Sequence, residues 1–460
     1  MKNAIRLLPL VAALLGGCAL THVEPPKPVD APAQFKEASG DWAAARTDVV
    51  TPEAWWTLFH DPVLDDLQSK LIIGNENLKA AATQVANARA VLSASRSAYW
   101  PTLSVGADAS RGKSGGGNVG NSSSLSATAG WEIDLWGSLA EGISQAGAQL
   151  RASTADLASA RLSAQALLVQ TYFGLRATEV QQDIYDRTVA AYQRSLDLTR
   201  ARRDAGVVAT TDVLQAETQL RSAQAQAADA KAQRAVAEHA LAVLLGLPPS
   251  ALNLDRAAAL PAVPVVPGLL PSTLLERRPD IAAAAARVKS AYAQIGIANA
   301  AYFPSISLSA DGGWRESGLK NLISSPNLFW SLGASVAESI FDGGRRQLAS
   351  AQARNAADNA TAVYRQTVLT AFQEVEDNLV LARALEEEAT LQQAAVQAAR
   401  RNLEITEDQY KAGTVSYLNV VTAQASLLNA ENSLVNVQNR QLSSVNQLLK
   451  NIAGRWQPAS

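Results

Sequence analysis

The side chains that most often carry out catalysis are few and scattered along this chain of 460 residues. The three histidines, His22, His60 and His239, lie far apart, and no carboxylates accompany them at the spacing of a metal site. A phosphate-binding glycine loop does not occur in the sequence. We therefore expect a protein that is not an enzyme and that binds no metal and no cofactor.

The one cysteine, Cys18, stands where covalent modification is expected. A basic start is followed by an apolar run over residues 7–15, which is typical of an export signal peptide. The Leu-Gly-Gly-Cys motif that ends at Cys18 resembles a bacterial lipoprotein signal, in which the cysteine is acylated and becomes the mature N-terminus. An ordinary signal peptide with an incidental cysteine is the alternative. We expect residues 1–17 to be the signal peptide and 18–62 to be a lipid-anchored segment.

The composition is that of a folded protein with long helices. Hydrophobic residues make up 48% of the chain and charged residues 18%, and the net charge of −2 offers no basic field for a nucleic acid partner. Aromatic residues are sparse, whereas Ala and Gln recur, which favours helices packed through small side chains. After the signal, no apolar stretch of about 18 residues could form a spanning helix. We expect any membrane crossing to be made by strands of a β-barrel.

The sequence contains an internal duplication. Residues 98–104 closely match residues 301–307, and Asp204-Ala205-Gly206 matches Lys411-Ala412-Gly413 at nearly the same offset. Matching segments that keep the same order and nearly the same separation along the chain predict two copies of one fold unit. We expect a first repeat at 63–247, a proline-rich connector at 248–278, a second repeat at 279–452 and a C-terminal tail at 453–460.

Each repeat has two stretches in which apolar and small polar residues alternate, as in the strands of a membrane barrel. A soluble sandwich is the alternative interpretation. Pro101 and Pro304 stand where a helix gives way to the first strand, and Gly137 and Gly343 where the second strand returns to a helix. Asp108 and Asp311 are among the carboxylates that alternate with the apolar residues, so we expect them on the face of the strands that lines the barrel interior. The predicted strands cover about 102–111, 124–135, 305–314 and 328–341.

Four strands are too few to close a barrel, and an open sheet edge in lipid leaves backbone groups unpaired. We therefore expect the chain to form oligomers, and three copies would supply twelve strands. Beyond the strands, the chain shows no strong break from Gly137 to Gly206, or from Gly344 to Gly413. Each run spans roughly 100 Å as a helix and is followed by a return helix, which predicts two long coiled-coil hairpins.

Several motifs are those of a known family. The sequence resembles the TolC-like outer membrane efflux proteins, and more closely the OprM/NodT-like lipoprotein subgroup that serves resistance-nodulation-division (RND) multidrug pumps. The resemblance covers nearly all of the mature chain. The motifs that carry it are Trp55-Trp56-Thr57-Leu58-Phe59-His60-Asp61-Pro62, Glu276-Arg277-Arg278-Pro279-Asp280-Ile281, Ala301-Tyr302-Phe303-Pro304-Ser305-Ile306, Phe341-Asp342-Gly343-Gly344 and Glu374-Val375-Glu376-Asp377.

The resemblance implies an α+β membrane protein, a homotrimer with a twelve-stranded transmembrane β-barrel continued by an α-helical tunnel. It also implies a place in the outer membrane of a Gram-negative bacterium, with the helices in the periplasm. The expected partners are outer membrane lipid, a periplasmic adaptor (membrane fusion) protein and an inner membrane RND-type transporter. The expected function is passive export of small molecules. Alternatives are a type I-like protein secretion channel, a heavy-metal export channel or a structural coiled-coil lipoprotein.

The resemblance also implies a periplasmic gate at the helical tips, where Gly206 and Gly413 match the family's helix-to-helix turns. The segment that begins at Tyr417 matches the constricting segment, and Leu418 occupies the place of an apolar ring residue, although ordinary helix packing is the alternative. Thr422 stands where many members have a pore-facing Asp, and Asn419 is also uncharged. This departure puts a charged ring at that level in doubt. Asp212, in the first hairpin, is the remaining carboxylate candidate, unless it is a helix N-cap.

Overall fold

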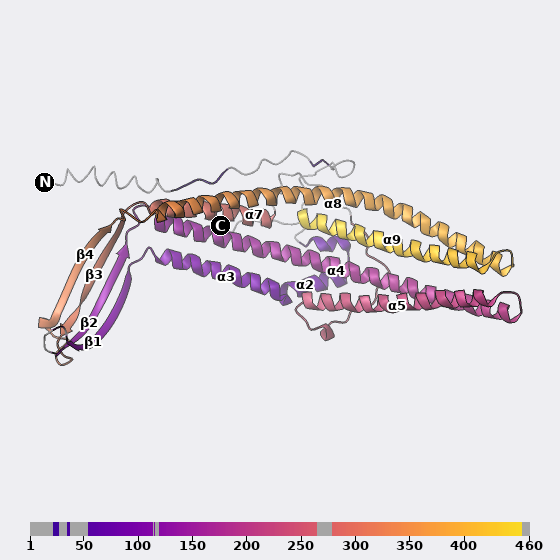
Figure 1. The fold of residues 1–460 in the computed structure, drawn as a ribbon, viewed down its shortest axis with the longest axis horizontal. Helices are drawn as coiled ribbons and strands as arrows, with labels where there is room; N and C mark the ends of the chain where they lie inside the picture. The colour runs from indigo at the N-terminus through magenta and orange to yellow at the C-terminus, as the bar shows by residue number, and fades with distance from the viewer. Residues whose placement is uncertain are drawn as a thin grey trace. The chain divides into compact units, whose positions relative to one another are not determined.

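The structure is a computed structural model that describes residues 22–26, 35–36, 54–113, 115, 119–264 and 278–452. The expected signal peptide, Cys18 and the tail at 453–460 lie outside the described residues. The helices and strands in chain order are η3 (Trp55–Phe59), α2 (Pro62–Gly74), α3 (Glu76–Ser97), β1 (Thr102–Lys113), β2 (Val119–Glu132), α4 (Ser138–Asp204), α5 (Thr210–Leu244), η4 (Pro249–Ala251), α7 (Pro279–Ala300), β3 (Ser305–Glu316), η5 (Ser325–Asn327), β4 (Leu328–Ala337), α8 (Arg345–Lys411) and α9 (Tyr417–Ile452) (Figure 1).

The chain divides into two compact units, and each unit takes segments from both halves of the sequence. The first contains the four strands, and the second contains the paired ends of the two long helical hairpins. The fold class predicted from the sequence, four strands with long helices in a duplicated chain, is confirmed. The first unit comprises Met1–Val29, Ala82–Asp156 and Asp280–Thr367, and the second comprises Asp30–Ala81, Leu157–Pro279 and Val368–Ser460.

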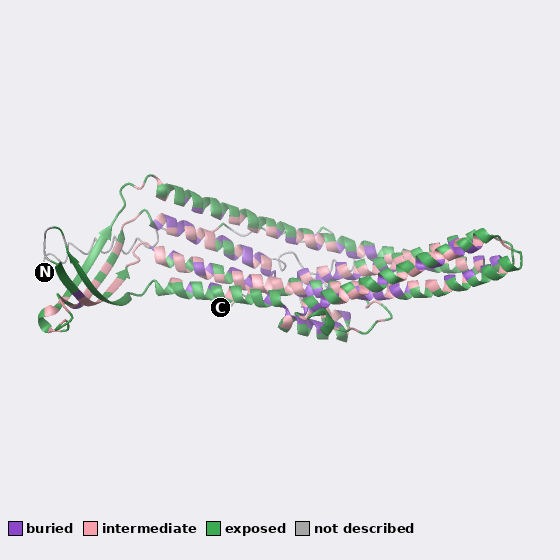
Figure 2. Ribbon diagram, turned by 60° about the horizontal axis from the view of Figure 1, so that its bottom comes forward, coloured by how far each residue is buried: buried purple, intermediate pink, exposed green. Residues whose placement is uncertain are grey.

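The four strands form one antiparallel sheet in the order β1-β2-β3-β4, so β1 and β4 are its edges. Register places Leu125 opposite Ala107 on one side and opposite Trp314 on the other, and Trp314 lies opposite Leu328. Directly opposed residues share a face, so most apolar residues of the four strands gather on one face, whereas Phe329, opposite Gly313, lies on the other. The two edge strands are exposed along nearly their whole length (Figure 2).

The first and third strands each end two residues later than predicted, and the second and fourth differ more. The second strand begins earlier and ends earlier than 124–135, because Val119 to Asn121 pair with the end of β1. The fourth strand ends at Ala337 instead of near 341, and Glu338 beyond it accepts a hydrogen bond from Nη1 of Arg346 at 3.1 Å. The alternation of residue types continues past the last residue that pairs with a neighbouring strand, so a prediction from the alternation makes this strand too long.

The junctions between strands and helices are built from the prolines and glycines singled out above. Pro101 precedes β1 and Pro304 precedes β3, where its carbonyl oxygen accepts a hydrogen bond from Trp136 Nε1 at 2.6 Å. Gly137 and Gly343 adopt φ values of 79° and 65°, which favour glycine, just before α4 and α8 begin. These four residues therefore mark both ends of both strand pairs.

In the second unit, helices α4 and α5 form one antiparallel hairpin, and α8 and α9 form the other (Figure 1). The helices α4 and α8 each contain 67 residues, and α5 and α9 contain 35 and 36. Within the described part of the chain, we find no helix that is both long enough and apolar enough to cross a membrane.

Candidate functional site at the hairpin tips

The two hairpins turn in the same way at their tips. In the first, Gly206 N–H donates to Arg203 O at 2.8 Å and Val207 N–H to Arg202 O at 2.9 Å. In the second, the equivalent donors are Gly413 and Thr414, each at 3.0 Å from its acceptor. This pair of bonds is the Schellman motif, which needs a left-handed residue after the helix. Gly206 and Gly413 provide it, with φ values of 74° and 79°.

Behind the turns, all four helices share one buried cluster. Tyr410 and Tyr417 contact each other within it, with ring centroids 5.6 Å apart and planes inclined at 58°. Tilted aromatic pairs of this kind stabilise packing beyond their buried area. The two hairpins are therefore joined near their tips by a common core. The buried members are Tyr192, Leu196, Val213, Ala216, Leu220, Ala223, Tyr410, Tyr417, Val420 and Val421.

Polar contacts also connect the first hairpin to the second. Arg202, near the end of α4, donates from Nη1 to the carbonyl oxygen of Tyr410 at 2.6 Å, and its guanidinium carbon lies 4.6 Å from the centroid of the Tyr410 ring. Ser195 donates to the Tyr417 hydroxyl at 3.3 Å. Arg202 could not be singled out from the sequence, because an arginine in the last turn of a helix is common for reasons local to that helix.

The first turns of α9 place the expected gate residues on two different faces. Tyr417 is buried against the first hairpin, whereas Leu418 is 56% exposed and Asn419 and Thr422 are also exposed. Thr422 Oγ1 donates to Leu418 O at 3.0 Å, within the helix itself. Leu418 is thus not packed between helices of its own chain, and this face of α9 is open to solvent or to another molecule.

Asp212 lies in the first turn of α5, but it is not the N-cap. The N-cap residue is Ala209, whose C=O accepts from the Asp212 N–H at 3.1 Å, so the alternative raised for Asp212 is wrong. The side chain is half-buried and lies close enough to disfavour ionisation of Tyr417. A carboxylate in the first turn is favoured by the helix dipole. A group of His, Cys, Asp and Glu side chains suited to a metal ion is absent from the residues described.

The buried tyrosines of this unit give a testable pH dependence. Burial raises the pKa of Tyr192 to about 12, and burial is also the main reason that the pKa values of Tyr417 and Tyr172 lie above the usual range. A raised pKa favours the neutral phenol in the folded state. Its contribution to stability is therefore complete below the unfolded pKa of about 10 and is lost as the pH rises through the folded pKa.

We expect Tyr172, Tyr192 and Tyr417 to ionise above the usual range of tyrosine when tyrosinate absorbance is followed in an alkaline titration of the native protein. Replacing Tyr192 by Phe should remove one late-ionising group and leave the early phase unchanged. Simultaneous ionisation of all nine tyrosines near pH 10 in the folded protein would contradict the buried position of these phenols.

The polar face of the sheet carries Asp108 and Asp311, the carboxylates predicted to lie inside the barrel. Asp311 Oδ1 accepts a hydrogen bond from Thr128 Oγ1 at 2.6 Å, and Asp108 lies opposite Ser124. Both carboxylates alternate with apolar neighbours that point to the other face. Asp134, beyond the end of β2, instead accepts the Ala140 N–H at 2.8 Å at the start of α4.

Comparison with known proteins agrees with this arrangement. Residues 67–247 and 270–454 match the family described as outer membrane efflux protein. Two relatives from Pseudomonas putida, the antibiotic efflux pump outer membrane protein ArpC and the toluene efflux pump outer membrane protein TtgC, are each 32% identical over 478 residues, covering 99% of this chain and 96% of their own. The solved outer-membrane channel OprN superposes with a TM-score of 0.87 at 28% identity, over 94% of this chain and 98% of that one.

The fold and the paired hairpins thus define an outer membrane channel of the TolC-like class. The chain belongs to the outer membrane efflux protein family and is the outer membrane component of an efflux pump in a Gram-negative bacterium. Its function is transport and not catalysis, as predicted from its scattered histidines and single cysteine.

Proposed function

We propose that the chain is one subunit of a homotrimeric channel that passively exports small molecules, such as drugs and toxic compounds, from the periplasm to the exterior. The observation that carries this proposal is a four-stranded sheet with an apolar face and two edges, β1 and β4, that are unpaired within the described chain. Three copies, each pairing its β4 with the β1 of the next, would close a twelve-stranded barrel without a free edge. The efflux of antibiotics and toluene by relatives supports small molecules as cargo.

The proposed partners follow from this role. A passive outer membrane conduit needs an energised transporter, here of the RND type in the inner membrane, and a periplasmic adaptor protein to join the two. The proposed anchor is an acyl group on Cys18, supported by the lipoprotein-like motif that precedes it. Loss of palmitate incorporation in a Cys18→Ser variant, alongside incorporation by the native chain, would test the anchor directly.

The proposed gate is the exposed face of α9 at the hairpin tips. Leu418 is the apolar residue of this face, and Asn419 and Thr422 flank it. In a trimer, three leucines around the axis would form an apolar constriction, which hinders ions by excluding water. We propose that engagement of the adaptor or the transporter splays the second hairpin and widens this ring.

The gate is tested by replacing Leu418 with serine. We expect the purified wild-type trimer to give small, flickering conductance in a planar bilayer, and the Leu418→Ser trimer to give a several-fold larger mean conductance because the ring becomes wettable. Leu391→Ser, at a leucine of α8 that is 65% exposed, is the matched control and should conduct like wild type. Light scattering establishes the mass of each preparation.

Unchanged conductance in a Leu418→Ser trimer would remove Leu418 from the gate while leaving the channel intact. A monomer without conductance would instead overturn the barrel itself and return the long helices to a structural role.

A further inference from the structure

A groove of about 780 Å³ opens at the first helix–strand junction, within the first unit. Its walls are aromatic, and its one charged residue is Arg96, in the last turn of α3. Trp100 is 75% exposed, which is unusual for so large an apolar side chain. The lining residues are Arg96, Tyr99, Trp100, Pro101, Trp131 and Ile143.

The indole of Trp131 is held in place by a hydrogen bond from its Nε1 to the carbonyl oxygen of Tyr99 at 2.9 Å. Its ring therefore forms a fixed wall, and its polar atom is already satisfied. The groove lies directly before β1, at the level where the apolar face of the sheet begins. An aromatic cluster at this level corresponds to the boundary between hydrocarbon and water in a membrane barrel.

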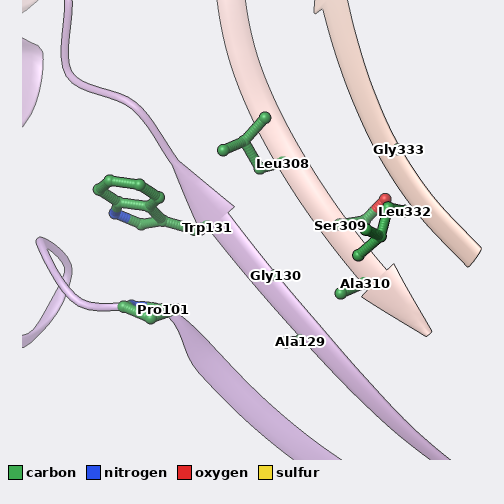
Figure 3. A pocket seen from close by; sticks show the side chains of 9 residues that line it. All are labelled: Pro101, Ala129, Gly130, Trp131, Leu308, Ser309, Ala310, Leu332 and Gly333. Carbon is green, nitrogen blue, oxygen red and sulfur yellow. The ribbon is translucent and has the colours of Figure 1, made fainter. Parts of the chain in front are cut away.

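A second, smaller groove of about 350 Å³ shares Pro101 and Trp131 with the first and continues onto the sheet. Figure 3 shows Trp131 at the end of β2, with Leu308 and Ala310 on the neighbouring strand. Ala129, Ala310 and Leu332 are directly opposed across three strands and therefore share the apolar face. In this groove the small side chains of Ala129 and Ala310 lie beside the larger Leu308 and Leu332. The first groove is aromatic and contains a cation, Arg96. The second is lined mainly by apolar residues and contains no charged residue.

We propose that these two grooves form a binding site for one glycerophospholipid per subunit, with the phosphate on Arg96 and an acyl chain along the second groove. Arg96 has no ion-pair partner among the residues that the structure describes, so its guanidinium is available for an anion. Guanidinium groups bind phosphate oxygens through two parallel hydrogen bonds. A free phosphate ion would leave the apolar groove empty, and a hydrocarbon alone would leave the cation unpaired. This inference rests on the proposed barrel, which puts the apolar face in lipid.

The site is tested by native mass spectrometry of the delipidated channel titrated with palmitoyl-oleoyl phosphatidylglycerol. We expect up to one bound lipid per subunit, and roughly tenfold weaker binding for Arg96→Gln, because a charge-assisted contact is lost. Arg89→Gln is the matched control, since Arg89 is an exposed arginine of the same helix outside the groove, and it should bind like wild type. Dioleoylglycerol, which lacks the phosphate, should bind as weakly to wild type as phosphatidylglycerol binds to Arg96→Gln.

Equal lipid binding by wild type and Arg96→Gln, or equal binding of both lipids, would overturn the proposal. If the groove is instead covered by a second copy of the chain, no lipid binds the intact oligomer and Trp100→Ala lowers the oligomeric fraction, which also overturns it. A conducting trimer with lipid binding independent of Arg96 refutes only the lipid site. A preparation that is monomeric and does not conduct refutes the proposed channel as well.

Discussion

Replacing Glu179 by alanine is expected to lower the free energy of unfolding by about 3–5 kcal/mol, because it leaves a buried arginine without its counter-ion. Glu179, in α4, is 1% exposed and accepts from Arg176 Nη1 at 2.7 Å and from Arg234 Nε at 2.9 Å. The Arg176 side chain is itself only 5% exposed, so water cannot replace the lost carboxylate. Such a charge has a large desolvation cost once it is unpaired.

The same carboxylate also fixes the segment after η4. The Ala257 N–H donates to Glu179 Oε2 at 3.0 Å, while the carbonyl oxygens of Leu254 and Asp255 accept from Arg234 and Arg176 at 2.6 and 2.7 Å. These bonds join the start of the connector between the repeats to α4 and α5. We therefore expect faster amide hydrogen exchange at residues 252–258 in the Glu179→Ala variant, beyond any global loss of stability.

Urea unfolding in detergent measures the first effect, and Glu217→Ala provides the control. Glu217 also faces two arginines, Arg200 and Arg221, but at 3.8 and 3.5 Å and with 37% of its side chain exposed. An exposed pair of this kind contributes at most about 1 kcal/mol. If Glu179→Ala were no more destabilising than Glu217→Ala, the ion network around Glu179 would make no net contribution to the free energy of unfolding. Some buried ion networks behave in this way when they are replaced as a whole.

The architecture was predictable because it depends on short-range regularities that the sequence repeats. The alternation from Leu125 to Trp131 shows in the sequence which residues share a face, and the sheet register places them on that face. Gly206 and Gly413 were predictable as turns because a Schellman motif needs a left-handed residue, which strongly favours glycine. The duplication doubled each of these signals.

The contacts between elements were not predictable in the same way. Glu179 and Ala257 lie 78 residues apart, and Arg202 and Tyr410 lie 208 apart. No periodicity relates these pairs, since each depends on how separate helices are aligned along their axes. The N-cap alternative for Asp212 failed for a related reason, because α5 begins at Thr210 and its N-cap residue is Ala209. Boundaries between turns and helices depend on backbone geometry that residue types specify only loosely.

The contact between Arg202 and Tyr410 joins the two hairpins, so it can oppose opening of the channel. Leu418 and Thr422 belong to one hairpin, so a change in either alters the surface that the hairpin presents. Arg202 belongs to the other hairpin and holds the end of α8 through a charged hydrogen bond and a cation–π contact. If the second hairpin moves away from the first on opening, these contacts exist only in the closed arrangement, and their free energy adds to the cost of opening.

Replacing Arg202 by alanine is therefore expected to favour the open channel. A charge-assisted hydrogen bond and a half-exposed cation–π contact together contribute about 2 kcal/mol, which shifts the equilibrium between closed and open forms by roughly 30-fold. Open probability in single-channel recordings measures the effect. Arg203→Ala is the control, because Arg203 pairs with Asp204 at 2.5 Å within its own hairpin and should leave gating unchanged. A trimer whose open probability is insensitive to Arg202 would mean that the two hairpins move together, and that the proposed ring at Leu418 opens without separating them.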